Sequence, residues 1–204
     1  MRLFYAPNTI SIAVAIALHE AGLDYTPRRV DFAAGEQTTP EYHAINPKGR
    51  VPALETDGDL LTETGAILEY IAALAPETGL FPADPRQAAH VRSVMYYLAS
   101  TMHVNHAHMR RGHRWANAQS SFEDMAAKTP QTMTESCVFV EENALRGRFV
   151  LGERLSMADP YLFVVCTWLE GDGVDVSPFP KITAFRDAMR ARASVKRAQD
   201  LGML

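Results

Sequence analysis

The sequence has little of what marks several large classes of protein. It contains only two cysteines in 204 residues, Cys137 and Cys166, and both lie in helical patterns, so we expect two small buried side chains in a reducing compartment rather than a disulfide framework. It has no run of about 18 apolar residues that could span a bilayer. The N-terminus begins directly with a strand pattern instead of a secretory leader. We therefore expect a cytoplasmic protein with no membrane partner.

Excess charge of one sign is also absent. Lys and Arg number 20 against 24 Asp and Glu, which gives a net charge of −4 and no electrostatic footprint for nucleic acid. The short basic group of Arg110, Arg111 and Arg114 does not change this, so we expect no nucleic-acid partner. With 47% apolar and 22% charged residues, the chain has the composition of a globular protein with one large or two small domains.

Strand and helix patterns alternate in the first part of the chain. A strand at residues 2–5 is followed by a break at Pro7 and by an apolar helix from Ser11 through Leu18, which ends at Gly22. The other expected elements are a strand at 24–30, a short helix at 40–45, a hairpin that turns at Asp57-Gly58 with its return strand at 59–61, and a helix from Thr62 or Thr64 to Leu74. The expected order is therefore β-α-β-α-β-β-α.

The character of the sequence changes at a segment rich in proline and glycine, for which we expect a linker at residues 77–84 between domains 1–76 and 85–204. Beyond it no strand pattern is present. Helical periodicity is found at residues 87–115, 129–145, 157–169 and 180–192, and near the C-terminus. Ser156 and Asp159 have the spacing of a capping box at the start of one of these helices.

The stretch from Asn46 to Leu54 is the most informative part of the sequence. Pro52 lies inside an apolar run and cannot donate to a strand ladder, so the backbone of Val51 is left to pair with another extended peptide, and the Val51–Pro52 bond can be cis. Glu63 and Thr64 fall in the first turn of the next helix, where a carboxylate can bind an ammonium group and free N–H groups favour an anion. A ligand with an amino-acid head and a short extended peptide would suit both places.

At these residues, and over essentially its whole length, the sequence resembles the soluble glutathione transferases, most closely the bacterial beta class. The resemblance implies a thioredoxin-like α/β N-terminal domain followed by an all-α C-terminal domain, a homodimer, glutathione as co-substrate and no metal. It also implies that a cis Val51–Pro52 pairs with the cysteinyl part of glutathione, and that Glu63 and Thr64 hold the γ-glutamyl head. The predicted glutathione-binding residues are Tyr5, Asn8, Ile10, Lys48, Arg50, Val51, Pro52, Glu63 and Thr64.

Ionising the glutathione thiol requires a hydrogen-bond donor. A free thiol has a pKa of about 8.5, and lowering it by about two units needs ~2.7 kcal/mol, which one hydroxyl hydrogen bond and a helix N-terminus together can supply. Ile10 stands where the beta class has a cysteine, which excludes a protein thiol and leaves a hydroxyl as donor. Ser11 is the first candidate, although it would also serve as an N-cap without a catalytic part. Thr9 and Asn8 are the next candidates, and Tyr5 is better explained by packing.

The helix at 87–115 carries several histidines, of which His103 and His106 share one face. A metal site needs a third ligand on that face and none is evident, so we expect them to line a cleft. The resemblance implies that His103 faces the sulfur across the domain boundary, and it places Tyr96 where the family has an asparagine donated by the partner subunit. The electrophile is expected beside the sulfur, against Met102, His106 and Met109, although methionines at helical spacing are more often core.

Lys48 and Arg50 either steer the anionic tripeptide or are ordinary solvated charges. The function that the resemblance implies is a glutathione transferase in detoxification, which delivers the thiolate to a small apolar electrophile. The alternatives are a glutathione-dependent isomerase, peroxidase or dehalogenase on the same fold, or a non-catalytic binding module. Absence of the cysteine argues against the reductive enzymes.

Overall fold

The structure, a computed structural model, describes residues 1–204. The chain forms two compact units, one made of Met1–Pro82 with Met189–Leu204 and the other of Ala83–Ala188. None of the helices is long and apolar enough to cross a membrane.

The first unit is built on a four-stranded sheet. Its strands are β1 (Arg2–Tyr5), β2 (Thr26–Arg29), β3 (Ala53–Glu55) and β4 (Leu60–Thr62), in the order β2-β1-β3-β4. β2 runs parallel to β1, whereas β1 with β3 and β3 with β4 are antiparallel. The parallel strands β1 and β2 need a crossover helix between them. The antiparallel strands β3 and β4 are joined by the hairpin that the sequence predicted at Asp57-Gly58. The predicted thioredoxin-like fold is confirmed.

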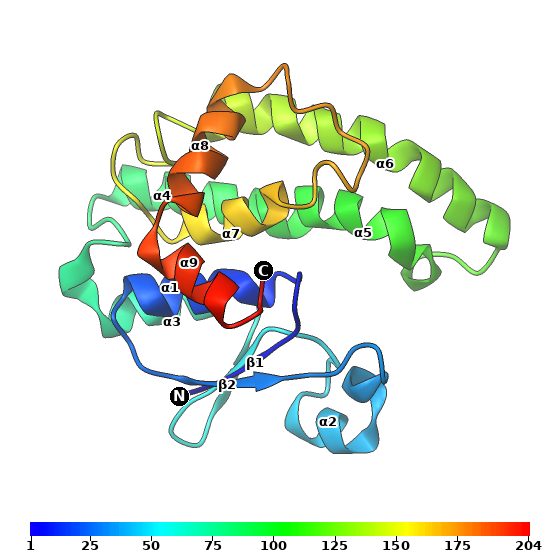
Figure 1. Cartoon of the computed structure of the whole chain (residues 1–204), viewed down its shortest axis with the longest axis horizontal. Coiled ribbons are helices and arrows are strands. Elements are labelled where there is room, and N and C mark those ends of the chain that lie inside the picture. The colour runs from blue at the N-terminus through cyan, green and yellow to red at the C-terminus, as the bar shows by residue number, and fades with distance from the viewer. The chain divides into compact units, whose positions relative to one another are not determined.

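Helices pack on both faces of this sheet because successive side chains of a strand point to opposite faces, and both faces are apolar. Phe4 and its register partner Ala53 pack with Tyr42 of α2 (Pro40–Ile45) on one face. Leu3 and Leu54 alternate to the other face and are also buried. On that side of the sheet lie α1 (Ser11–Glu20) and α3 (Thr64–Leu74) (Figure 1). These helices agree closely with the predicted ones.

The last helix of the chain belongs to the first unit. The predicted domain 85–204 included this segment, but α9 (Ala193–Asp200) packs beside α1 (Figure 1). Arg192 Nε and Nη2 donate to the Glu20 carboxylate at 2.5 and 2.6 Å, and the Ser194 hydroxyl donates to the same group. The proline- and glycine-rich linker around residue 80 marks where the chain passes from the first unit to the second. No such composition marks Met189, where the chain comes back to the first unit.

The second unit is entirely helical apart from isolated bridges. Its α-helices are α4 (Pro85–Tyr97), α5 (His103–Arg111), α6 (Gln119–Phe139), α7 (Ala158–Cys166) and α8 (Pro180–Arg190), the last of which ends in the returning segment. A π-helical turn, Leu98–Met102, joins α4 to α5, and another, Val140–Ala144, extends α6. Figure 1 shows α5 and α6 lying side by side as long rods. The all-α second domain predicted from the sequence is confirmed.

Buried side chains fix this helical unit. Asp159, at the predicted capping box, is completely buried and accepts hydrogen bonds from the Val150 N–H at 2.8 Å, the Ser156 N–H at 2.6 Å and the Ser156 hydroxyl at 2.8 Å. Cys137 and Cys166 are free and fully buried, as predicted. Burial raises the pKa of the Cys137 thiol to about 12 and that of Cys166 further, so both act as packing residues.

Candidate functional site

The turn between β1 and α1 is closed by its own hydroxyl groups. The Thr9 hydroxyl donates to the Ala6 carbonyl at 2.8 Å and lies 2.7 Å from the Ser11 hydroxyl, which accepts from the Ala6 N–H at 3.2 Å. Asn8 adopts a positive φ of 56°, and its N–H donates to the Met203 carbonyl at 2.9 Å. Ser11 is 0% exposed, whereas Asn8 is exposed and Thr9 partly so. Thr9 and Asn8 are therefore the polar side chains that this turn presents to a ligand.

The first turn of α1 has unused hydrogen-bond donors. The backbone N–H groups of Thr9, Ile10 and Ser11 have no acceptor within the chain, as expected at a helix N-terminus. Together with the positive end of the helix dipole, they favour an anion at this point. The position suits a thiolate.

A rigid loop precedes β3. Asn46 is buried, and its side-chain amide donates to the Arg50 carbonyl at 2.8 Å while its oxygen accepts from the Lys48 N–H at 3.1 Å. The Tyr42 hydroxyl donates to the same Arg50 carbonyl at 2.9 Å. The Val51–Pro52 peptide bond that follows is cis, and neither the N–H nor the C=O of Val51 is paired within the chain. The loop thus holds one free backbone donor and one free acceptor in a fixed place.

Glu63 lies at the start of α3. It has a positive φ of 69°, which is rare for a residue other than glycine, and its side chain is 72% exposed. The Lys48 ammonium contacts the Glu63 carboxylate at 2.5 Å and also donates to the Thr62 hydroxyl at 2.9 Å. Because an exposed ion pair is worth about 0–1 kcal/mol, a ligand ammonium group can replace Lys48 at this carboxylate.

The sheet register brings these three segments together. Phe4 pairs with Ala53, so the turn after β1 and the Val51–Pro52 bond before β3 lie at the same end of neighbouring strands. Ala53 in turn pairs with Thr62, which places Glu63 at that end as well. The free amides at α1, the free backbone of Val51 and the Glu63 carboxylate therefore line one edge of the unit.

Comparison with known families agrees with this geometry. Residues 1–73 match the model of the glutathione S-transferase N-terminal domain, and residues 114–198 match that of the C-terminal domain. The chain belongs to the glutathione S-transferase family. A glutathione transferase homologue from Sulfitobacter, solved with bound glutathione, is 63% identical and superposes with a TM-score of 0.98 over 100% of this chain and 98% of the homologue.

Curated members of the family include two activities. The glutathione S-transferase GstA of Escherichia coli O157:H7 is 30% identical over 97% of this chain and 96% of its own length. A maleylacetoacetate isomerase of Pseudomonas aeruginosa is also 30% identical, over 97% of this chain and 95% of its own. Membership of the family therefore does not choose between transfer and isomerisation.

In the first unit, the predicted glutathione-binding residues lie at the sheet edge formed by the α1 N-terminus, Val51 and Glu63. Their side chains differ in exposure and in their hydrogen-bond partners. Tyr5 is buried in β1, so its part is packing, and Ile10 is buried at the N-cap of α1. The Arg50 side chain is exposed, whereas its carbonyl serves the loop. Thr64 is buried as the first residue of α3. The expectation that Ser11 points its hydroxyl at the sulfur differs from the structure, because that hydroxyl turns inward to close the turn.

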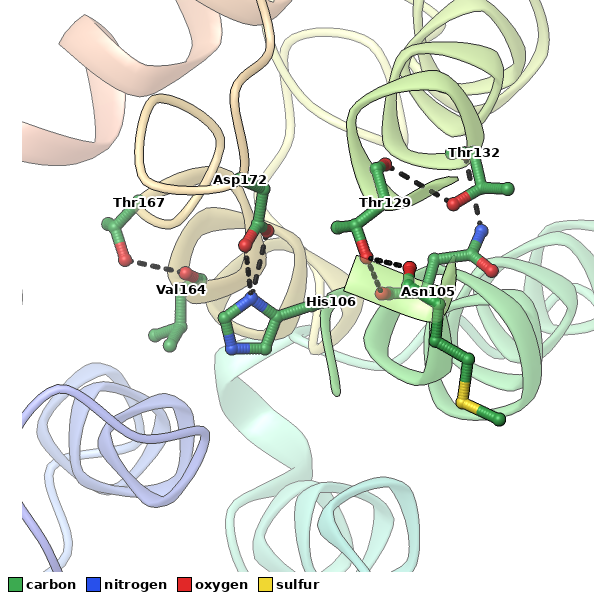
Figure 2. A network of polar contacts seen from close by, with 8 residues as sticks. Asn105, His106, Thr129, Thr132, Val164, Thr167 and Asp172 are labelled. Atoms are coloured by element: carbon green, nitrogen blue, oxygen red, sulfur yellow. Dashed lines mark hydrogen bonds and ion pairs between the residues drawn. The ribbon is translucent and has the colours of Figure 1, made fainter. Parts of the chain in front are cut away.

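In the helical unit, the predicted cleft residues have different surroundings. Met102 is fully buried core, so its expected place in a cleft differs from the structure. Met109 lines an open cleft of about 230 Å³ between the end of α5 and the start of α6. His103 lies against Trp168 with ring centroids 5.1 Å apart. His106 binds Asp172, as Figure 2 shows. No group of three or more His, Cys, Asp or Glu side chains is arranged to hold a metal ion.

Two buried polar residues, Asn46 and Asp172, were not predicted from the sequence. Asn46 has no motif of its own, and its buried amide is evident only once the loop is folded. Asp172 stands between Gly171 and Gly173, a pattern that indicates an exposed turn, and yet it is almost completely buried. The partner of Asp172, His106, is 66 residues away along the chain, whereas the partners of Asn46 lie two and four residues from it.

Proposed function

We propose that this protein is a glutathione transferase that binds glutathione at the shared sheet edge and transfers its thiolate to a small apolar electrophile. The observation that carries the proposal is the fixed Val51 backbone beside Glu63 and the α1 N-terminus, in a chain 63% identical to a homologue solved with bound glutathione. Extended peptides bind such free strand backbone through main-chain hydrogen bonds.

Each end of glutathione has a matching group. The Val51 N–H and C=O pair with the cysteinyl backbone, while the Glu63 carboxylate takes the ammonium of the γ-glutamyl head and Thr64 its carboxylate. Lys48, displaced from Glu63, and Arg50 then lie near the anionic tripeptide and offset its charge. The ligand therefore exchanges one solvated ion pair for two.

Thr9 is the proposed donor to the sulfur. The Ser11 hydroxyl lies 2.7 Å from that of Thr9, so Ser11 can donate to Thr9 once the Thr9 hydroxyl turns its one proton from the Ala6 carbonyl to the thiolate. This chain of two hydroxyls, with the free amides of α1, supplies the ~2.7 kcal/mol that a two-unit drop in thiol pKa requires. Asn8 is the alternative donor from the same turn, and we propose His103 as an additional residue acting on the bound sulfur.

A glutathione-dependent isomerase is the second candidate, because a maleylacetoacetate isomerase is as similar to this chain as GstA is. Isomerisation uses the same thiolate, so the binding roles above are common to both. We also propose a homodimer that acts in the cytoplasm in detoxification, as the resemblance implies. An assay with an aryl halide and with a cis-alkenoic diacid distinguishes the two reactions.

Glutathione binding is tested by titration calorimetry on the native protein and the Glu63→Ala variant. We expect the variant to bind at least about tenfold more weakly, since a charged hydrogen-bond partner is lost, worth ~1.5 kcal/mol or more. Glu41→Ala, which removes an exposed carboxylate of α2, is the matched control and should bind normally. A native protein that does not bind glutathione would refute the proposed function.

A further inference from the structure

We propose that the turn joining α5 to α6 is a docking surface for an anionic phospholipid bilayer. The surface consists of Arg110, Arg111, His113, Arg114 and Trp115, which we call the α5–α6 tip. It belongs to the second unit alone. The docking goes beyond the proposed function and does not depend on it. It also differs from the expectation of no membrane partner, which was drawn from the lack of an apolar run long enough to span a bilayer.

Charge is distributed unevenly along the chain, and the tip lies in its basic part. From Pro85 to Phe122 the sequence contains five Arg, five of the chain's seven His, and no Asp or Glu. The other residues carry 15 Lys and Arg against all 24 Asp and Glu. A basic segment is thus set apart within a chain of net charge −4, and such an asymmetry directs one face of a protein toward an anionic surface.

The tip concentrates this charge at one end of the helical unit. The 3₁₀ turn Gly112–Arg114 follows the last residue of α5, and Figure 1 shows this connection at the end of the paired rods α5 and α6. Arg110 and Arg114 are exposed, and Arg111 is partly exposed. The dipole of α5 favours basic residues in its last turn, but Arg114 lies beyond the helix, so the dipole does not account for it.

A tryptophan is exposed beside these charges. Trp115 is 47% exposed, although its backbone N–H donates to the Gly112 carbonyl at 2.9 Å. Its ring is T-shaped to that of His108, with centroids 4.5 Å apart. The ring is therefore held in place without joining the core. Tryptophan concentrates at the boundary between lipid and water, where its apolar ring is buried and its indole N–H stays hydrated.

A small cleft next to the tip suits a lipid headgroup. It has a volume of about 230 Å³, and its lining includes the apolar side chains of Met109 and Phe122 together with Arg110. Glu123, the acidic residue of this cleft, accepts a hydrogen bond from the Gln119 amide at 3.0 Å. A phosphodiester bound by Arg110 can place its glycerol and first methylene groups against Met109 and Phe122.

The turn is held against α6, so the tip keeps its shape. Gly112 is buried, and a Cβ at that position would lie 3.1 Å from the Phe122 side chain and 3.2 Å from the Phe122 Cα. A preformed surface loses little conformational entropy when it docks. The arginines and Trp115 can therefore meet a flat bilayer together.

The proposed docking has a consequence for the substrate. Apolar compounds leave water for the hydrocarbon of a bilayer, so an enzyme docked on the bilayer meets them at a higher local concentration. This consequence rests on the proposed function, whereas the docking itself does not.

Vesicle sedimentation tests the docking. The native protein is mixed with vesicles of phosphatidylcholine alone, or of equal parts phosphatidylcholine and phosphatidylglycerol. Salt is set at about 0.1 M and about 1 M, which changes the Debye length from about 10 to about 3 Å. We expect partition onto the anionic vesicles at low salt, at least about tenfold weaker partition onto the neutral vesicles, and loss of partition at high salt.

Paired variants separate the tip from the net charge of the protein. Each arginine near an anionic membrane changes partition about fivefold, so Arg110→Gln/Arg114→Gln should partition about 20- to 30-fold more weakly. The matched control is Arg146→Gln/Arg148→Gln, in the exposed loop after α6 of the same unit. It removes the same charge, and it should lower partition less than about threefold because charges far from the bilayer are screened. Thermal melts confirm that each variant is folded.

Tryptophan fluorescence reports the contact itself. The chain has two tryptophans, and Trp168 lies against His103 and His106 with its indole nitrogen buried. A blue shift on addition of anionic vesicles should therefore come from Trp115. We expect Trp115→Phe to lose this shift.

The inference is overturned if the native protein does not partition onto anionic vesicles, if both double variants lose partition equally, or if Trp115→Phe keeps the blue shift. Binding of a DNA duplex at low salt without binding of vesicles would assign the tip to nucleic acid, and it overturns the inference as well. Glutathione titration is run beside these measurements. A native protein that does not bind glutathione refutes the proposed function and leaves the docking unaffected.

Discussion

The hydroxyl groups of Thr9 and Ser11, in the turn between β1 and α1, differ in their exposure to a bound ligand. Thr9 is partly exposed, while Ser11 is buried behind it. If Thr9 donates to the thiolate, then Thr9→Val, which keeps the shape, should raise the pKa of bound glutathione by about 1–2 units. Ser11→Ala should raise it less, since Ser11 acts through Thr9. The thiolate absorbance of the complex, titrated against pH, measures both.

Thr26→Val, on the exposed face of β2, is the control for this titration and should leave the thiol pKa unchanged. A Thr9→Val complex with the native pKa would exclude Thr9. A shift in Asn8→Ala in its place would assign the role to Asn8.

Asp159 is the residue on which we expect the helical unit to depend most. Its buried carboxylate accepts the Val150 N–H, the Ser156 N–H and the Ser156 hydroxyl, so Asp159→Ala leaves three buried donors unpaired. At 1–3 kcal/mol for each group, partly relieved by relaxation, we expect a loss of about 3 kcal/mol in the free energy of unfolding. Urea denaturation measures it, with the exposed Asp124→Ala as the control. A loss as small as that of the control would show that the box does not stabilise the unit.

Some features of single residues could be predicted from the sequence, and others could not. The unpaired backbone of Val51 and the place of Glu63 at the start of α3 could be predicted, because they depend on a proline inside an apolar run and on spacing within one hairpin. The inward turn of Ser11 could not, since a serine before an apolar helix reads the same whether its hydroxyl faces a ligand or the preceding strand. Asp172 could not be predicted because its partner His106 is 66 residues away along the chain.

Among the elements, α1 and α9 are joined by a charged contact. Burial alone would raise the pKa of the Glu20 carboxyl, but the hydrogen bonds from Arg192 and Ser194 outweigh it and lower that pKa below its ordinary value of 4.5. The carboxylate is thus better stabilised in the folded state, and this contribution is complete above pH 4.5 and is lost as pH falls through the lowered value. Stability should therefore decrease on the acid side.

We expect Glu20→Gln to unfold with a free energy about 2 kcal/mol lower at pH 7, because three charge-assisted hydrogen bonds are weakened. The difference from the native protein should shrink as pH is lowered below 4.5, where native Glu20 also becomes neutral. Denaturation at several pH values measures it. Glu36→Gln, at an exposed pair with Arg28, should have a much smaller effect, and a pH-independent difference for Glu20→Gln would argue against the ionic contact.

Element boundaries were predictable where apolar spacing and caps agree, as for α2 at residues 40–45. They were not predictable for α6, which begins at Gln119 and not near Thr129. Gln119–Lys128 is polar and largely exposed, so it has little apolar periodicity, and Pro130 reads as a helix boundary although it lies inside the helix. Packing against α5 evidently decides the length of this helix, which is information that a local pattern does not contain.

At the scale of the whole molecule, the last residues of the chain reach the turn between β1 and α1, beside the proposed site. The Met203 carbonyl accepts the Asn8 N–H at 2.9 Å, and the Met203 side chain is fully buried. Asn8 stands at a positive φ immediately before Thr9, so the last residues help to determine the conformation of the turn that would activate the thiol.

Removal of Gly202–Leu204 should therefore change the conformation of the turn at Asn8 and Thr9. Burial of Met203 is worth about 2 kcal/mol, and the Asn8 N–H loses its acceptor, so we expect lower stability together with a higher pKa of bound glutathione. The control is Leu204 deletion alone, which leaves the Met203 contact in place. Thermal melts and thiolate titration separate the two effects: a truncated protein that is destabilised but ionises glutathione normally would show that the Asn8 turn holds its conformation without the C-terminus.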